Sequence, residues 1–543
     1  MNYPIHRLLH LVSLTALIQI LVPMAQAAPP PPSSIDYARY FDAMPKDATQ
    51  SQCVLEIVEN SQKQKVLIAK PPVTNPAMTC PDMFSWKLFS DAVRAGFAQR
   101  WATDQDVWPS TPWPLCDTAT TTDCCKANSN TNDKTHCPSF PGTELTLLNA
   151  VPQAAPMRQG RLPALLRLHG QVNEAAKSAV EAAILAHEGV ATVGKDDPTR
   201  ELRQENTELV FRNRAMFDYV LQNGLYYSEG LAAVFNNNSN DIANNAPYHQ
   251  RNTPRSVTNI EFPVDAVMIK ANFVTPDQAA KAGLKEDQAN PVLKAWFKSD
   301  KGNLQEYWLI AFHISSKDTP NWVWSTFEYV SNIGRCDFIG CNDAYGYASQ
   351  PNQEGRNLAT NYTPPHVTTD GFKSAPSAIF ALNGVYPAEK ITDGLKNVFD
   401  QLDIGTGPNE TVPSGLPATS SWFPSQKDKA WRSYRLKGSQ VNFTDSAGRT
   451  TLLGNSVTEA GFVTSSSCVT CHARANVNKS GGPALGVFEP KTGYQGYLLS
   501  SHGTPNAGWF NQTATKPLPL AVQTDFVWGF LNACPATTGG CKP

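Results

Sequence analysis

The chain of 543 residues lacks several patterns that would assign a function at once. It has no glycine-rich dinucleotide pattern, no phosphate-binding loop and no His-Glu-x-x-His pair of zinc ligands. Its formal net charge is −2 at pH 7, so it has no basic excess for nucleic acid or an anionic membrane surface. No apolar run after residue 22 approaches the length of a bilayer-spanning helix. We therefore expect neither a nucleotide-dependent enzyme, nor a nucleic-acid-binding protein, nor a membrane span in the mature chain.

Composition indicates a globular protein rich in loops. The chain contains 42 prolines and 34 glycines, while 41% of its residues are hydrophobic. Its length corresponds to two to four units of ordinary domain size. We predict an α+β fold in three parts: a mixed, helix-biased N-terminal region (28–253), a β-rich middle region (254–420) and a small C-terminal region with short helices (421–543).

The first 27 residues have the pattern of a signal peptide. An apolar run covers residues 8–22, Pro23 ends it, and Ala25-Gln26-Ala27 supplies the small residues of a cleavage site. The alternative is a membrane anchor, but this run is too short to span a bilayer comfortably and contains His10. We therefore expect the mature protein to be exported.

The pattern Cys-x-x-Cys-His at residues 468–472 is the strongest chemical signal in the chain. Cys468 and Cys471 are spaced to add to the two vinyl groups of a haem, and His472 follows as the proximal iron ligand. Two other interpretations are a redox disulfide and one half of a zinc site. The first requires a βαβ unit around the pair, which the flanking sequence does not indicate. The second requires another ligand pair, and Cys534 and Cys541 are spaced too widely for the usual zinc knuckle.

The other ten cysteines are an even number, which is typical of disulfides in an oxidising compartment. Short separations predict Cys336–Cys341 and Cys534–Cys541 bridges. A Cys53–Cys80 bridge is also expected. The remaining four cysteines are predicted to form two bridges within one polar loop: Cys116, Cys124, Cys125 and Cys137. The alternative for these cysteines is a second metal site.

Hydrophobic periodicity predicts helices in the N-terminal region. One helix is expected where Val172, Ala175, Ala176, Ala179, Val180 and Ala183 recur at helical spacing. Asp197-Pro198 predicts the start of a second helix. Its apolar face would contain Leu209, Met216, Phe217, Val220 and Leu221. The polar residues 236–253 are predicted to form a connector.

Strands dominate the expected middle region. Residues 260–264 and 267–269 are predicted to form a strand pair, and residues 307–314 and 322–330 a hairpin around the turn at 318–321. Further on we expect a strand over 431–443, a short helix from about Val457 and a helix over 520–532. One of the three serines at 465–467 is expected to cap a helix that contains Cys471 and His472.

The segment SSCVTCHARA at residues 466–475 resembles the attachment site of monohaem c-type cytochromes. The phrases NWVWSTFE (321–328) and TDFVWGF (524–530) are similar to those of exported bacterial proteins of the cytochrome c family. This resemblance implies one covalent haem c bound through Cys468 and Cys471, His472 as proximal iron ligand, a periplasmic location and redox activity. It names neither a substrate nor an electron donor or acceptor.

The chain departs from the small electron-carrier cytochromes at the second axial ligand. Those proteins supply a methionine after the motif, whereas the last methionine here is Met268. His502 is the one histidine downstream of His472 and is a candidate distal iron ligand. Other candidates lie upstream, at His313, His169 or Met268, and the remaining alternative is an open or water-filled position. A second imidazole would lower the reduction potential relative to a thioether.

Two functions follow as expectations. The first is electron transfer or redox catalysis in the periplasm, with a redox partner protein or a small-molecule substrate; His313 and Glu328 are candidate acid–base residues, although both could be purely structural. The second is a haem-containing protein that binds a ligand or senses redox state or a gas. Arg474 is a candidate partner of a haem propionate, or else a surface charge. The sequence does not decide whether the protein is an enzyme, and a haem-dependent oxidoreductase is one of its possible functions.

Overall fold

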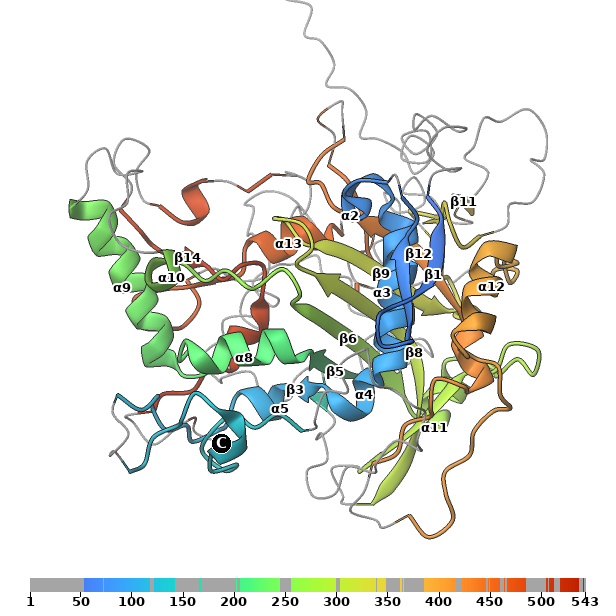
Figure 1. Cartoon of the computed structure of the whole chain (residues 1–543), viewed down its shortest axis with the longest axis horizontal. Helices are drawn as coiled ribbons and strands as arrows, with labels where there is room; N and C mark the ends of the chain where they lie inside the picture. Colours follow the sequence, from blue (N-terminus) through green and yellow to red (C-terminus); the bar gives the residue numbers. More distant parts are fainter. Residues whose placement is uncertain are drawn as a thin grey trace, which may run out of the picture. The chain divides into compact units, whose positions relative to one another are not determined.

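The computed structural model describes most of the chain after residue 52 (Figure 1). The described residues are 53–71, 73–117, 122–141, 166–167, 202, 206–244, 255–298, 303–337, 339–347, 362–363, 365, 385–416, 421–445, 448, 450–459, 463, 466–484, 504–505, 507–511, 518–536 and 541. The predicted signal peptide and the predicted helix around residues 172–183 lie outside them.

The described helices are of two kinds. The α-helices are α2 (Pro76–Thr79), α3 (Pro81–Ala95), α4 (Phe97–Arg100), α5 (Asp104–Val107), α8 (Arg214–Gln222), α9 (Ser228–Asn244), α10 (Arg255–Thr258), α11 (Pro276–Lys281), α12 (Asp393–Gln401) and α13 (Cys468–Ala473). Short 3₁₀ helices cover Ser129–Thr131, Lys429–Ser433, Ala507–Trp509 and Trp528–Asn532.

The described strands are β1 (Leu55–Glu59), β2 (Lys65–Ala69), β3 (Ala102–Thr103), β4 (Leu166–Arg167), β5 (Thr207–Arg212), β6 (Val267–Val274), β7 (Leu293–Lys298), β8 (Leu304–Ser316), β9 (Val323–Tyr329), β10 (Cys341–Asn342), β11 (Tyr362–Thr363), β12 (Tyr434–Gln440), β13 (Asn476–Val477) and β14 (Val522–Gln523). The chain therefore has the α+β fold that its sequence predicts.

An eight-stranded antiparallel sheet organises the fold. Its strand order is β12-β9-β8-β6-β5-β3, with β4 paired to β5 and β7 paired to β8. The hairpin predicted from residues 307–330 is its β8–β9 pair, in which Phe312 lies opposite Phe327. Because β3 and β5, β6 to β9, and β12 come from different parts of the sequence, all three predicted regions contribute strands to one sheet.

One face of this sheet is apolar and is covered by α3 (Figure 1). Pro81 occupies the first turn of α3, and Gly96 ends the helix in the left-handed conformation, with φ 63°. Phe89 of α3 is fully buried and packs its ring against Phe327 at a centroid distance of 5.2 Å and against Phe312 at 5.9 Å. These aromatic contacts form the centre of the larger hydrophobic core.

The opposite face of the same strands is polar. Side chains alternate along a strand, so the neighbours of Phe312 and Phe327 point away from α3. His313 pairs with Thr326 across β8 and β9, and the side chain of Asn455 contacts both. Ser456 donates its backbone N–H and its hydroxyl to the carboxylate of Glu328, which is fully buried. This polar face lies beneath the segment that leads to the Cys-x-x-Cys-His motif.

Several predicted elements in the first half of the chain are wrong. Leu209 lies in strand β5, where it pairs with Ala271, and not in the helix; Asn213 caps α8 after it. The expected buried residues Met216 and Phe217 do lie on α8. The polar residues 236–244 continue helix α9, and residues 245–253 of that predicted connector lie outside the described residues. Residues 260–264 do not pair as a strand, whereas β6 begins at Val267.

Two predicted C-terminal elements also differ. Residues 456–459 form a turn rather than a helix, with Asn455 Oδ1 accepting the N–H groups of Val457 and Thr458. The predicted helix over 520–532 is replaced by strand β14, a turn and a 3₁₀ helix. Asp525 and Phe526 have φ values of 48° and 67°, which are incompatible with a continuous right-handed helix.

All five expected disulfides are present. They are Cys53–Cys80, Cys116–Cys124, Cys125–Cys137, Cys336–Cys341 and Cys534–Cys541. The polar loop around residues 116–137 is therefore cross-linked by two disulfides, and its four cysteines do not form a metal site. Such bridges are typical of proteins from oxidising compartments. Among the described residues, none forms a helix long and apolar enough to cross a bilayer.

Candidate functional site

Helix α13 contains the whole Cys-x-x-Cys-His motif. Cys468 and Cys471 are the two cysteines that form no disulfide, and Cys468 Sγ donates to the carbonyl oxygen of Leu453 at 3.4 Å. The helix is confirmed, and Ser467 occupies its N-cap position, but the side chain makes no capping bond. Its hydroxyl donates to Thr470 Oγ1 at 3.1 Å and accepts from Gln440 Nε2 at 2.9 Å. This network fixes the start of α13 against strand β12.

The two thiols lie in surroundings that favour the protonated form. Burial raises the pKa of Cys471 to about 12, and the nearby carboxylate of Glu459 adds to the effect. Burial also raises the pKa of Cys468 well above its usual value. Redox-active Cys-x-x-Cys pairs have the opposite character, since they depend on a stabilised thiolate. Moreover, α13 is followed by the two-residue strand β13, paired antiparallel to β14, and not by a βαβ crossover.

His472 is held in a defined tautomer. Its Nδ1 atom lies 2.7 Å from the carbonyl oxygen of Phe526. Because a carbonyl oxygen accepts but cannot donate, Nδ1 carries the proton and Nε2 carries the lone pair of the neutral ring. Burial lowers the pKa of His472 to about 4, which keeps the imidazole neutral at physiological pH. The indole of Trp324 packs against the imidazole, with a centroid separation of 4.3 Å.

Asp525 fixes the peptide that accepts this hydrogen bond. Its carboxylate accepts from the backbone N–H of Phe262 at 2.7 Å, from Lys317 Nζ at 2.5 Å and from Trp322 Nε1 at 3.2 Å. These bonds stabilise a left-handed backbone at Asp525 and Phe526, and Trp322 is left-handed too, with φ 62°. Bulky side chains rarely adopt this conformation, and such strain concentrates at functional sites.

The same C-terminal segment anchors α13 at two further points. Gln523 Nε2 donates to the carbonyl oxygen of Ala473 at 2.8 Å, and Trp528 Nε1 donates to that of Cys471 at 3.3 Å. The last carbonyls of a helix have no partner within the helix, so these side chains cap it from outside. Residues 523–528 therefore position the motif, although they lie about 50 residues after it.

A cluster of charged side chains occupies the polar sheet face near the two thiols. His313 Nε2 lies 3.3 Å from Glu459 Oε1 and 3.1 Å from Asn455 Nδ2. Lys270 Nζ, on the neighbouring strand, lies 2.9 Å from Glu208 Oε2. Burial alone would raise the pKa of Glu459, but His313 and Lys270 outweigh it and the pKa is lowered. The charges of Glu459 and Lys270 also act on both thiols.

The candidate acid–base residues His313 and Glu328 have different partners. His313 faces Glu459 instead, while Glu328 is held by Ser456, by Asn332 at 3.3 Å and by Lys437 at 3.5 Å. Both residues thus belong to hydrogen-bonded networks on one sheet face. The predicted hairpin already placed His313 and Glu328 on adjacent strands. The contact of His313 with Glu459 could be identified only from the folded chain.

Arg474 is not a surface charge. Its side chain is 2% exposed, and the guanidinium lies over the indole of Trp509 at 4.5 Å from the ring centroid. Of the distal-ligand candidates, His313 and Met268 lie on the sheet face towards α13, and Met268 shares a buried cluster with Cys468. His169 and His502 lie outside the described residues.

Within the part of the chain that the structure describes, no three His, Cys, Asp or Glu side chains are arranged to hold a metal ion by themselves. A haem requires less of the protein, because the porphyrin supplies four iron ligands of its own. The free thiols, the fixed tautomer of His472 and its apolar surroundings fit covalent haem c. No family model, curated protein or solved structure matches this chain.

Proposed function

We propose that this protein is a periplasmic c-type haem protein that functions in electron transfer or redox catalysis through one covalent haem. The observation that supports it most directly is the hydrogen bond from His472 Nδ1 to the carbonyl oxygen of Phe526. Metal-bound histidines generally donate their second ring N–H to such a partner, which fixes the ring and raises its basicity as a ligand.

Each motif residue has one role in this proposal. Cys468 and Cys471 would hold the porphyrin through thioether bonds, and His472 Nε2 would hold the iron. The bound group would supply a one-electron Fe(III)/Fe(II) couple. The indole of Trp324 packs against the imidazole, and the ring of Phe526 packs against that indole at a centroid distance of 6.3 Å. A preorganised ligand is what a tuned redox centre requires.

The competing interpretations of the motif have less support. A dithiol redox pair is disfavoured because both thiols have raised pKa values and are protonated at neutral pH.

A periplasmic location accords with five disulfides alongside two free cysteines, since haem attachment consumes that one pair of thiols. The large sheet exceeds what a simple electron carrier needs, so a redox partner protein or a small-molecule substrate is part of the proposal.

The first experiment is the visible spectrum of the dithionite-reduced protein, with and without carbon monoxide. The protein is expressed with its own N-terminus in a host that attaches haem c, and we expect the α and β bands of a c-type haem. Absorption bands that do not change when carbon monoxide is added would indicate six-coordinate iron and a function in electron transfer. A shift on adding carbon monoxide would indicate an open or displaceable position, and catalysis or gas sensing would then take precedence.

The covalent bond is tested separately. A Cys468→Ser, Cys471→Ser double variant should carry no haem after denaturation and acid extraction, while the wild type should keep it. A Cys336→Ser, Cys341→Ser variant is the control, because it also removes two cysteines but leaves the motif intact. Haem retained by the motif variant after extraction, or no haem in the wild type, would refute the proposal.

A further inference from the structure

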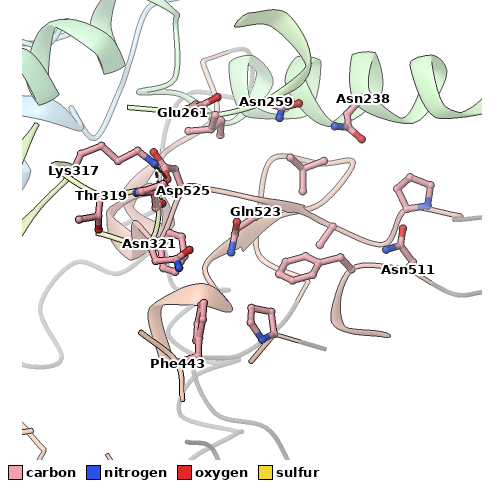
Figure 2. Close-up of a pocket in the computed structure, with 18 of the residues that line it drawn as sticks. Asn238, Asn259, Glu261, Lys317, Thr319, Asn321, Phe443, Asn511, Gln523 and Asp525 are labelled. Carbon is pink, nitrogen blue, oxygen red and sulfur yellow. Dashed lines mark hydrogen bonds and ion pairs between the residues drawn. The ribbon is translucent and has the colours of Figure 1, made fainter. Parts of the chain in front are cut away.

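A pocket of about 640 Å³ lies beside the segment that holds His472 (Figure 2). It is formed by α9, the turn between β8 and β9, and the stretch from residue 519 to Phe526. Its volume is within the range of small-molecule sites, about 300–1,000 Å³. Phe526 contributes to its wall and, through its carbonyl oxygen, to the hydrogen bond with His472. A molecule bound there would contact the residue that positions the motif histidine.

Carboxamide side chains are prominent in the lining. Figure 2 shows Asn238 and Asn259 on one side of the pocket and Asn321 and Gln523 across from them. Two of these amides are fixed by the protein through their nitrogen atoms: Asn238 Nδ2 donates to Thr258 O at 2.8 Å and Gln523 Nε2 donates to Ala473 O at 2.8 Å. Their carbonyl oxygens are the groups that remain to accept hydrogen bonds from a ligand.

Apolar surface completes the lining. The rings of Phe443, Phe510 and Phe526 contribute to the wall, and Val264 at the rim is 74% exposed.

Thr319 Oγ1, on the opposite wall, is buried and has no hydrogen-bond partner among the described residues. A buried hydroxyl without a partner calls for a bound group or a water. Acceptors, donors and aromatic rings together suit a ligand with many hydroxyls and one apolar face.

The charges of the described lining residues disfavour an anionic ligand. Lys317 is the one basic side chain in the described lining, and its Nζ lies 2.5 Å from Asp525 Oδ1. Asp318 and Glu261 add two further carboxyl groups. A ligand carboxylate or phosphate would therefore meet like charges and no available cation, which costs binding free energy.

We propose that this pocket binds a neutral, hydroxyl-rich small molecule such as a sugar, with Asn321, Gln523 and Asn238 as hydrogen-bonding residues and the phenylalanine rings against the apolar face of the ligand. This inference goes beyond the proposed redox function and does not depend on it. If the protein proved to carry no covalent haem, the proposed sugar-binding site would be unaffected.

The test is saturation-transfer NMR on the full-length mature protein with three groups of sugars. Glucose, galactose, mannose and trehalose are the neutral probes, glucuronate is the anionic probe and glucosamine the cationic one. We expect transfer to at least one neutral sugar and none to glucuronate. Transfer to no neutral sugar, to glucuronate equally well, or to glucosamine alone would overturn the proposal.

An Asn321→Leu variant locates the binding. The side chain of Asn321 is partly buried, and the structural bond at this position uses its backbone carbonyl, which accepts from Trp324 Nε1 at 2.9 Å. We expect the variant to weaken sugar binding at least tenfold, while Asn397→Leu, at an exposed position of α12, leaves it unchanged. Unaltered binding in a folded Asn321→Leu protein, verified by its thermal midpoint, would place the sugar elsewhere and refute the assignment.

Discussion

The Nδ1 atom of His472 lies 2.7 Å from the carbonyl oxygen of Phe526, 54 residues further along the chain. That oxygen faces the ring because Asp525 and Phe526 adopt the left-handed conformation, with φ values of 48° and 67°. The motif histidine thus depends on a turn that belongs to a different part of the sequence. This dependence leads to the first prediction.

Replacing Asp525 by alanine should weaken both the fold and the position of His472. The change leaves Lys317 without its carboxylate, and breaking a buried ion pair in this way costs about 3–5 kcal/mol of unfolding free energy. It also releases the turn that holds Phe526. We expect a lower urea midpoint and, in the reduced protein, a haem spectrum that responds more to carbon monoxide. Asp265→Ala, an exposed position, is the control; equal stability and spectra in both variants would contradict the role of Asp525.

A His313→Gln variant should keep the iron coordination of the wild type. His313 Nε2 already lies within 3.3 Å of Glu459 and 3.1 Å of Asn455, and glutamine preserves a polar side chain there. We expect a loss of stability of about 1–3 kcal/mol from the weakened buried network. The reduced spectrum and its response to carbon monoxide should not change. Loss of low-spin bands in this variant would instead identify His313 as the distal ligand.

The stability of the protein should fall as the pH rises from about 4 to about 7 because of Asp343. Its carboxylate accepts from Trp86 Nε1 at 2.8 Å, yet burial and the neighbouring Asp82 raise its pKa to about 7. The unfolded chain loses this proton near pH 4 and the folded chain near pH 7, so folding takes up a proton in between. The contribution is up to about 4 kcal/mol at 1.4 kcal/mol per pH unit.

This pH dependence is measured by urea unfolding of the disulfide-intact protein at pH 5 and pH 8. In Asp343→Asn the side chain cannot ionise, so the difference between the two pH values should shrink. Asp393→Asn, at an exposed position in α12, should leave the difference as it is in the wild type. The same difference in wild type and Asp343→Asn would show that Asp343 does not titrate in this range.

The Cys53–Cys80 bridge should stabilise the protein more than the Cys336–Cys341 bridge does. The two bridges span 27 and 5 residues, and the entropy lost by the unfolded chain grows with the length of the closed loop. We expect the paired serine variants to lose about 3–4 and about 2 kcal/mol of unfolding free energy, respectively. Unfolding by urea in the absence of reductant gives both values, and the reverse order would contradict the loop-entropy explanation.

Local sequence patterns predicted the features that depend on neighbouring residues. The cysteine spacing predicted three disulfides by their partners and two more within one loop, because residues 5 to 27 positions apart meet readily; the pairing of the four loop cysteines comes from the structure. Alternation around the turn at 318–321 predicted the β8–β9 hairpin, and helical periodicity placed Met216 and Phe217 on the buried face of α8. The Cys-x-x-Cys-His motif formed by Cys468, Cys471 and His472 is likewise a local pattern, since it lies within five consecutive residues.

Tertiary contacts decided the rest. Leu209 pairs with Ala271 in the sheet, and this pairing outweighs the helical periodicity around it. The polar end of α9 stays helical because Asn238 is buried and donates to Thr258 O, against its weak intrinsic helix propensity. The Phe526 carbonyl at His472 and the carboxylate of Glu459 at His313 come from distant segments. A periodic pattern carries no information about such partners, since they meet only when the chain has closed the sheet and fixed the turns around it.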